Sequence, residues 1–212
     1  MDFDIPSYVM GKESCGGGGA PDFLEYIESD GSQYIDTGYV AQETTCLELI
    51  AAISSTQTTS YATPLGAAAA SYTSELFIRA WKNGSPFIYA AWGNGRYKDL
   101  TSGFSAFGEP IEFRLDKDKV LYLRRSGSLT SSYFNGTASS YPTSPLCLFG
   151  INVAGNIEQQ CAMKFYGLRI WENGQLVRHF LPAIAPSGVA CVYELLSGAF
   201  LYNRGSGSFT AS

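Results

Sequence analysis

Apolar and polar residues alternate in short runs along most of this chain, and glycine-bearing turns separate the runs. In the run "KFYGLRIWE", for example, we expect Tyr166, Leu168 and Ile170 to share one side with Lys164, while Arg169 faces the other side. A repeat of two with one apolar face is typical of antiparallel strands. Glycine interrupts almost every candidate helix, and no stretch keeps a helical period. The pattern therefore predicts an all-β protein.

Turn signals recur between the apolar runs and divide them into short strands. Asn-Gly is the strongest short hairpin signal, because both central residues of a type I′ turn need positive φ. The predicted turns lie at Asp30-Gly31, Asn83-Gly84, 116–119, Asn135-Gly136, Asn173-Gly174 and Ser197-Gly198. Eight or more strands with turns this frequent indicate a sandwich or a barrel. We interpret the strand pairs as a two-sheet antiparallel sandwich.

Composition narrows the classes of partner. The 212 residues are 45% hydrophobic and 16% charged, which is enough to build a core. The net charge of −5 does not suit a surface that follows phosphates, so we expect no nucleic acid as partner. No window of about 20 residues is both predominantly apolar and uncharged, so no membrane span is predicted. The start "MDFDIPSYVMGKES" also lacks the basic and apolar regions of a secretory signal, so synthesis in the cytoplasm is expected.

The cysteines and other ligand-type residues predict neither a metal nor a cofactor. The five cysteines are widely spaced and form no Cys-x-x-Cys pair, so they are interpreted as free and mostly buried thiols. The glycine run 16–19 is not followed by Gly-Lys-Ser/Thr, so it is no phosphate-binding loop.

The first residues predict a tethered docking segment. Four consecutive glycines at 16–19 form a flexible spacer. Ahead of them lies a short, largely apolar patch, which we predict to dock onto a partner: Ile5, Pro6, Tyr8, Val9 and Met10. The expected organisation is an arm and linker at 1–19 and one sandwich domain at 20–212.

Two stretches of the chain resemble a known fold family. "EYIESDGSQYIDTGY" (25–39) resembles the opening strands of laminin-G-like, concanavalin-A-like jelly-roll domains, and 145–210 looks like their closing half. The closing pattern "LVR.F.P...PSG....Y....G.F..N.G.G.F" is matched at Leu176, Val177, Arg178, Phe180, Pro182, Pro186, Ser187, Gly188, Tyr193, Gly198, Phe200, Asn203, Gly205, Gly207 and Phe209. The resemblance implies a two-sheet antiparallel jelly roll with a divergent middle.

The version of the fold in this chain is similar to one found in phage virion proteins and in surface proteins of gut bacteria. The segment "IPSYVMGK" followed by glycines likewise resembles the arms of virion proteins. The resemblance implies a capsid or tail protein that is localised to the virion. Other virion proteins would be its partners through residues 1–19, and a homo-oligomer such as a trimer would be its assembled form.

Catalysis is not expected from the residues. Jelly-roll relatives that cleave glycans carry a strand-borne Glu-x-Asp-x-x-Glu run, which this chain lacks. The nearest acidic sets lie at predicted turns or strand ends, where Asp commonly serves the backbone: Glu25, Glu28 and Asp30, and Asp116 and Asp118. The single histidine, His179, has no nucleophile in a suitable setting and is interpreted as a strand residue.

Carbohydrate binding is the alternative to catalysis that the residues leave open. Sugar rings stack on aromatic faces while amides and charged groups hold the hydroxyls. "YAAWGNGRYKD" offers Trp92, Asn94, Arg96 and Tyr97, although Trp92 could instead end a core strand. Together with the resemblance, this predicts a non-enzymatic phage virion protein whose jelly roll decorates or stabilises the particle or contacts host-surface glycans. A bacterial surface adhesin module is the alternative, and a glycoside hydrolase is third.

Overall fold

The structure of the protein is a computed structural model that describes residues 19–55, 61–81, 87–94, 97–100, 107–116, 120–125, 128–134 and 140–212. Within these ranges the regular elements are β-strands, apart from the short 3₁₀ helix η1 (Ala70–Tyr72). This confirms the all-β prediction. The predicted docking residues Ile5, Pro6, Tyr8, Val9 and Met10 lie outside the described residues.

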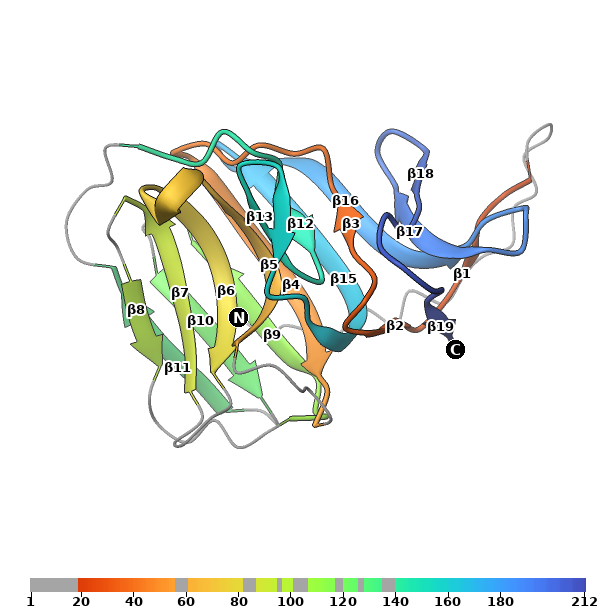
Figure 1. Ribbon diagram of the computed structural model, residues 1–212, viewed down its shortest axis with the longest axis horizontal. Coiled ribbons are helices and arrows are strands. Elements are labelled where there is room, and N and C mark those ends of the chain that lie inside the picture. Colours follow the sequence, from red (N-terminus) through yellow and green to blue (C-terminus); the bar gives the residue numbers. More distant parts are fainter. Residues whose placement is uncertain are drawn as a thin grey trace.

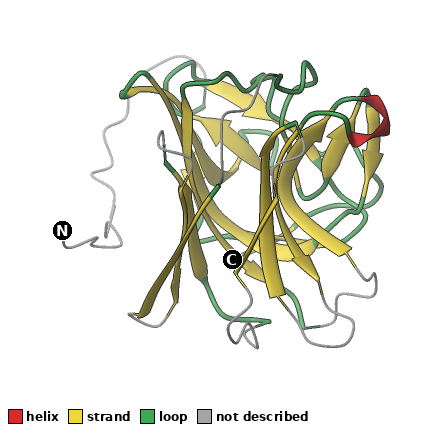
Figure 2. Ribbon diagram, turned by 90° about the vertical axis from the view of Figure 1, so that its left-hand side faces the viewer, coloured by secondary structure: helices red, strands yellow, loops and turns green. Residues whose placement is uncertain are grey.

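Two sheets face each other across a core, as Figures 1 and 2 show. In the part of the chain that the structure describes, the first sheet has eleven strands: β1 (Asp22–Phe23), β2 (Ile27–Asp30), β4 (Thr45–Ile53), β9 (Ile111–Leu115), β10 (Val120–Arg125), β11 (Ser128–Tyr133), β15 (Ala162–Glu172), β16 (Gln175–Ile184), β17 (Ala190–Glu194), β18 (Ala199–Leu201) and β19 (Thr210–Ala211). The second has eight: β3 (Ile35–Asp36), β5 (Tyr61–Ala68), β6 (Glu75–Trp81), β7 (Phe87–Gly93), β8 (Tyr97–Leu100), β12 (Cys147–Leu148), β13 (Ile151–Val153) and β14 (Asn156–Glu158).

The strand order joins segments that are far apart in the sequence. The first sheet runs β11-β10-β9-β4-β15-β16-β17-β18, and the second runs β14-β13-β5-β6-β7-β8. The described strand pairs are antiparallel except β13 and β5, which are parallel. The predicted two-sheet sandwich is thus confirmed, with one parallel pair that the sequence pattern did not indicate.

The core lies between the sheets and follows the alternation of the strands. In β9, Ile111, Phe113 and Leu115 have no exposed surface, whereas Glu112 and Arg114 between them are partly exposed. Burying each such apolar side chain stabilises the fold by about 1.5–3 kcal/mol.

A β-bulge in β15 shifts the apolar face of that strand. The register against β4 changes between Phe165 and Gly167, so one extra residue lies on β15. Phe165 is fully buried, Tyr166 and Lys164 are partly exposed, and Leu168 is buried again. The prediction that Tyr166 and Lys164 share a side with Leu168 is therefore wrong, because the bulge moves the inward positions by one residue.

Turn signals were interpreted correctly where both strands belong to one sheet. Asn173 and Gly174 have φ of 50° and 79° and connect paired Glu172 and Gln175, as the type I′ prediction requires. Ser197-Gly198 likewise joins paired β17 and β18. The strand pairs β6–β7 and β9–β10 are also present, although their turns and Asn135-Gly136 lie outside the described residues.

The Asp30-Gly31 turn has a different role. Strand β2 before it pairs with β15 and β19 in the first sheet, while β3 after it pairs with β12 in the second. The hairpin interpretation of this segment is wrong, because a turn sequence does not specify which partner each strand finds. Asp30 does serve the backbone as predicted, since its carboxylate accepts hydrogen bonds from the N–H (2.9 Å) and hydroxyl (2.6 Å) of Ser32.

The closing motif "N.G.G.F" forms a C-terminal clasp, residues 203–209. The side-chain oxygen of Asn203 accepts hydrogen bonds from the backbone N–H of Tyr34 (3.2 Å) and of Gly205 (2.8 Å). Phe209 is 7% exposed, and its ring lies 4.9 Å from that of Phe149. The clasp therefore holds the last residues against the segment between β2 and β3.

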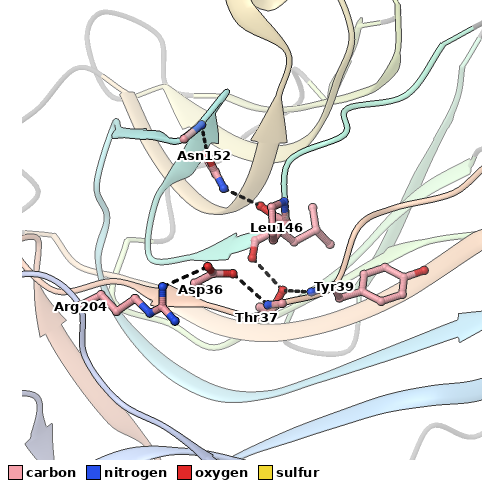
Figure 3. A network of polar contacts seen from close by, with 9 residues as sticks. Asp36, Thr37, Tyr39, Leu146, Asn152 and Arg204 are labelled. Atoms are coloured by element: carbon pink, nitrogen blue, oxygen red, sulfur yellow. Dashed lines mark hydrogen bonds and ion pairs between the residues drawn. The ribbon is translucent and has the colours of Figure 1, made fainter.

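A polar network that includes Arg204 of the clasp connects the clasp to β3, and the residues after β3 to the segment before β12 (Figure 3). Arg204 pairs with Asp36 at 3.4 Å. The Thr37 hydroxyl donates to the carbonyl of Leu146 (2.7 Å) and accepts from the backbone N–H of Tyr39 (3.2 Å). Residues from the start, the middle and the end of the domain thereby meet in one place.

Candidate functional site

The aromatic residue predicted to bind sugar lies in the core. Trp92 has no exposed surface, pairs with Leu76 in the row that faces the first sheet, and meets Tyr141 edge-on with ring centroids 6.4 Å apart. A ring without accessible surface offers no face to a sugar, so the interpretation of Trp92 as a stacking residue is corrected. Its position follows from alternation, because Ile88 and Ala90 on β7 are also buried in this core.

The other residues of that stretch carry no site in the described structure. Asn94 is half-buried immediately after β7. Arg96 lies outside the described residues, as does the side chain of Tyr97, whose backbone pairs with Ala91. Their predicted contact with glycans stays a prediction.

A different group of polar and aromatic side chains gathers on the outer face of the second sheet. Along β6, Leu76 and Ile78 belong to the main core, while Glu75, Phe77 and Arg79 alternate with them. Phe77 joins a separate apolar cluster with residues of β5, β7 and β13. The residues grouped around the guanidinium form what we call the Arg79 cluster: Tyr61, Thr63, Tyr72, Phe77, Arg79, Tyr89, Glu158 and Gln159.

Arg79 is buried but only partly hydrogen-bonded. The side chain is 6% exposed. Its Nε donates to the Thr63 hydroxyl (3.1 Å) and its Nη1 donates to the Tyr89 hydroxyl (2.9 Å). Its Nη2 is buried and has no hydrogen-bond partner among the described residues. A guanidinium carries five N–H donors, and the two donors on Nη2 of Arg79 make no hydrogen bond.

Four aromatic rings surround the guanidinium carbon of Arg79. It lies 3.8 Å from the ring centroid of Phe77, 5.5 Å from those of Tyr61 and Tyr89, and 5.9 Å from that of Tyr72. Cation–π attraction of this kind is worth about 0.5–2 kcal/mol per contact and partly replaces the hydration that burial removes. Tyr61 is the exposed member of the group, with 36% of its surface accessible.

A directed chain of hydrogen bonds fixes one side of Arg79. Thr63 accepts from Arg79 and donates to Oε1 of Gln159 (3.1 Å), and Nε2 of Gln159 donates to the Tyr72 hydroxyl (3.2 Å). Tyr72 in turn donates to the carboxylate of Glu158 (2.7 Å). Burial and this carboxylate raise the pKa of Tyr72 to about 12, so the phenol stays protonated at neutral pH and keeps donating.

A break in β5 brings Thr63 into this chain. The register between β5 and β6 shifts between Ala62 and Leu65, around Pro64. Proline has no backbone N–H and is confined to bulges and edges in sheets. In place of a ladder bond, the carbonyl of Pro64 accepts from Phe149 (2.9 Å) and the N–H of Thr63 donates to Gln159 (3.1 Å).

Sequence reasoning did not find the Arg79 cluster, although one signal for it was present. In the run "ELFIRAW", the charged residues Glu75 and Arg79 are four apart on an apolar strand, so they share the outward side. A charge within a strand that is apolar on both faces is a candidate functional residue. Thr63 and Gln159 come from segments without a comparable signal.

A second aromatic pair lies on the outer face of the first sheet. The rings of Tyr26 and Tyr166 are 5.6 Å apart, and the Lys164 ammonium lies 4.0 Å from the centroid of Tyr26. These residues are partly exposed. This pair holds no buried charge, in contrast to the Arg79 cluster.

The remaining reactive side chains are accounted for by packing. Among the described cysteines, Cys147, Cys161 and Cys191 are buried and Cys46 is partly exposed, all with free thiols, in agreement with the prediction. Burial raises the pKa of Cys147 and Cys161, which keeps them protonated. His179 is half-buried on β16, and burial together with Arg169 lowers its pKa.

Two further features are absent from the part of the chain that the structure describes. Within the described residues, no group of three or more His, Cys, Asp or Glu side chains is placed to hold a metal ion. The same residues contain no helix that is long and apolar enough to span a membrane.

Comparison with known proteins identifies the fold. No protein-family model and no curated protein sequence matches the chain. Among solved structures, the CBM40 domain of the Ruminococcus gnavus IT-sialidase bound to α2,3-sialyllactose has a TM-score of 0.52 at 11% identity, covering 76% of this chain and 95% of that domain. A second structure of this CBM40 has a TM-score of 0.52 at 13% identity, covering 72% and 91%.

Other solved structures are less similar in shape. A scytalido-glutamic peptidase with a transition-state analogue inhibitor has a TM-score of 0.46 at 12% identity, covering 89% of this chain and 98% of that one. A likeness of that size carries no argument about activity. The CBM40 likeness supports the fold described above, a two-sheet β-sandwich of the jelly-roll type.

Proposed function

We propose that this protein is a non-catalytic jelly-roll module that binds glycans at the Arg79 cluster. The observation that carries the proposal is the combination of Tyr61, 36% exposed, with a fixed guanidinium that keeps donors unused. An aromatic face stacks on a sugar ring, and convergent polar groups fix its orientation. A solved neighbour with a similar fold is a carbohydrate-binding domain described with a bound sialyllactose, which supports the proposal.

Glycan binding is tested by applying the labelled full-length protein to an array of bacterial-surface and host glycans. We expect selective binding, and we expect Tyr61→Ala to weaken it by about three- to tenfold, because one aromatic contact contributes about 0.5–1.5 kcal/mol. Tyr202→Ala is the matched control, since Tyr202 is also exposed (46%) but stacks on Phe200, away from the cluster. Equal losses for both variants would contradict the assignment of the site.

We further propose that the module is displayed on a phage particle through residues 1–19. The resemblance of the sequence to virion proteins and the glycine spacer at 16–19 support this part. A protein lacking residues 1–19 should no longer co-purify with particles, while its affinity for glycans stays unchanged. Co-purification of the truncated protein at the level of the full chain would overturn docking through the arm. A bacterial surface adhesin would use the same sugar site without a particle.

A further inference from the structure

We infer that the group which Arg79 binds is a carboxylate, so that the ligand is an acidic glycan. The inference rests on the proposed function and specifies its ligand class. It starts from the charge of Arg79 and from the one nitrogen of its guanidinium that the fold leaves without an acceptor.

A buried arginine without an acidic partner is unusual. Arg side chains are almost never fully buried unless they are paired, because removing the charge from water is costly. Arg79 is 6% exposed, and no ion pair joins it to a carboxylate within the described ranges. Rings and two hydroxyl oxygens surround it instead. The protein therefore compensates the positive charge of Arg79 only in part, and a bound anion would neutralise the rest.

Two acidic residues lie in the same region, but neither forms an ion pair with the guanidinium of Arg79. Glu75 is on the same side of β6 as Arg79, but their Cα atoms are about 13 Å apart, and no ion pair joins the two side chains among the described residues. Glu158 accepts from Tyr72, and the bonds from Tyr72 through Gln159 and Thr63 separate it from the guanidinium. These contacts hold Arg79 in place without neutralising it locally.

The geometry of the remaining donors favours a carboxylate over a hydroxyl. Thr63 occupies Nε and Tyr89 occupies one donor of Nη1, so the unused donors are on Nη2 and the rest of Nη1. Guanidinium and carboxylate form short, charge-assisted bonds that are about twice as strong as neutral ones, often in pairs. A sugar hydroxyl would accept one bond but would leave the charge buried.

In this proposal, the ligand reaches these donors past Tyr61. Its ring lies 5.5 Å from the guanidinium carbon and is the exposed member of the rings around it. Rotamer changes of an exposed side chain are fast compared with the movement of a strand. A ligand carboxylate would reach Nη2 by displacing this ring, which can then stack on the sugar. The proposal thus assigns Tyr61 and Arg79 to two parts of one ligand.

Calorimetry with chemically matched ligands tests the inference on the full-length protein. The probes are sialyllactose, its carboxyl methyl ester, lactose, a glucuronic-acid disaccharide with its methyl ester, and a short peptide ending in a free carboxylate. We expect at least one acidic sugar to bind about ten- to a hundredfold more tightly than its methyl ester. The reason is that esterification removes the negative charge to which Arg79 would donate. In Arg79→Gln this ratio should fall to near one, whereas in Arg169→Gln, whose arginine pairs with Glu48 on the other sheet, it should not change.

Each outcome separates the inference from the proposed function. Equal binding of acid and ester by the wild-type protein would overturn the carboxylate while leaving glycan binding intact. Binding of the peptide but of no sugar would overturn the acidic glycan as ligand. Absence of binding to all probes and to the glycan array would overturn both proposals. Because the acid-to-ester ratio is measured on the wild-type protein, the test remains decisive if Arg79→Gln fails to fold.

Discussion

Replacing Gly205 by alanine is expected to lower the free energy of unfolding by about 3 kcal/mol or more, the upper end of the cost of overpacking. An alanine Cβ at this position would lie within van der Waals collision distance of the carbonyl oxygen of Ser32, and 3.0 Å from the Cα of Gln33. Both are backbone atoms, so no side chain can rotate away. The clasp would have to move, and Asn203 would lose its bond to Tyr34.

Urea unfolding followed by fluorescence measures this loss, with Gly167→Ala as the matched control. An alanine Cβ at Gly167 would meet its nearest neighbour, the carbonyl oxygen of Phe180, at an ordinary 3.6 Å. The control should therefore change stability by less than about 1 kcal/mol. If both substitutions lowered the stability equally, the close approach of Ser32 would not explain why position 205 needs glycine.

Replacing Glu194 by alanine is expected to cost about 3 kcal/mol of stability. Its carboxylate is nearly buried (3% exposed) and accepts hydrogen bonds from the backbone N–H groups of His179 (2.9 Å), Leu196 (3.2 Å) and Ser197 (2.7 Å). Hydrogen bonds to a charged group contribute about 1.5–3 kcal/mol each but are not additive, and alanine leaves all three donors without this acceptor. Denaturant unfolding of the two proteins at pH 7 measures the difference.

Glu194→Gln distinguishes the charge from the shape of this side chain. Burial raises the pKa of Glu194, but the bonds from Ser197, His179 and Leu196 outweigh it, so the net pKa is below the usual 4.5. The stabilisation is therefore present above about pH 4.5 and is lost as the pH falls through the lowered pKa. The glutamine variant should lose less stability than alanine at pH 7 and should show a weaker acid dependence. An acid dependence equal to that of the wild-type protein would contradict this role.

The fold was predictable where the signal was local. Alternation in β9 and the Asn173-Gly174 hairpin follow directly from period-two burial and from positive φ, both of which are properties of neighbouring residues. The bulge in β15 between Phe165 and Gly167 was not predictable in this way, because an extra residue on one strand is visible only against its partner. The assignment of β2 and β3 to different sheets depends on partners more than a hundred residues away for the same reason.

The candidate site was harder to predict than the fold. The sequence offered Trp92 because aromatic residues near glycine resemble an exposed loop, but the alternation of β7 directs that ring into the core. The Arg79 cluster combines β5, η1, β6, β7, β14 and the turn after β14, and pairing of β13 with β5 brings Gln159 beside Thr63. Such a site becomes visible from the strand order and not from spacing along the chain.

The most direct test of the account is a crystal structure of the full-length protein with the tightest-binding glycan from the array. The account predicts that the sugar lies on the outer face of the second sheet, with its ring against Tyr61 and an acidic oxygen within hydrogen-bond distance of Nη2 of Arg79. A sugar bound instead at the Tyr26–Tyr166 pair on the first sheet, with Arg79 unchanged, would contradict it.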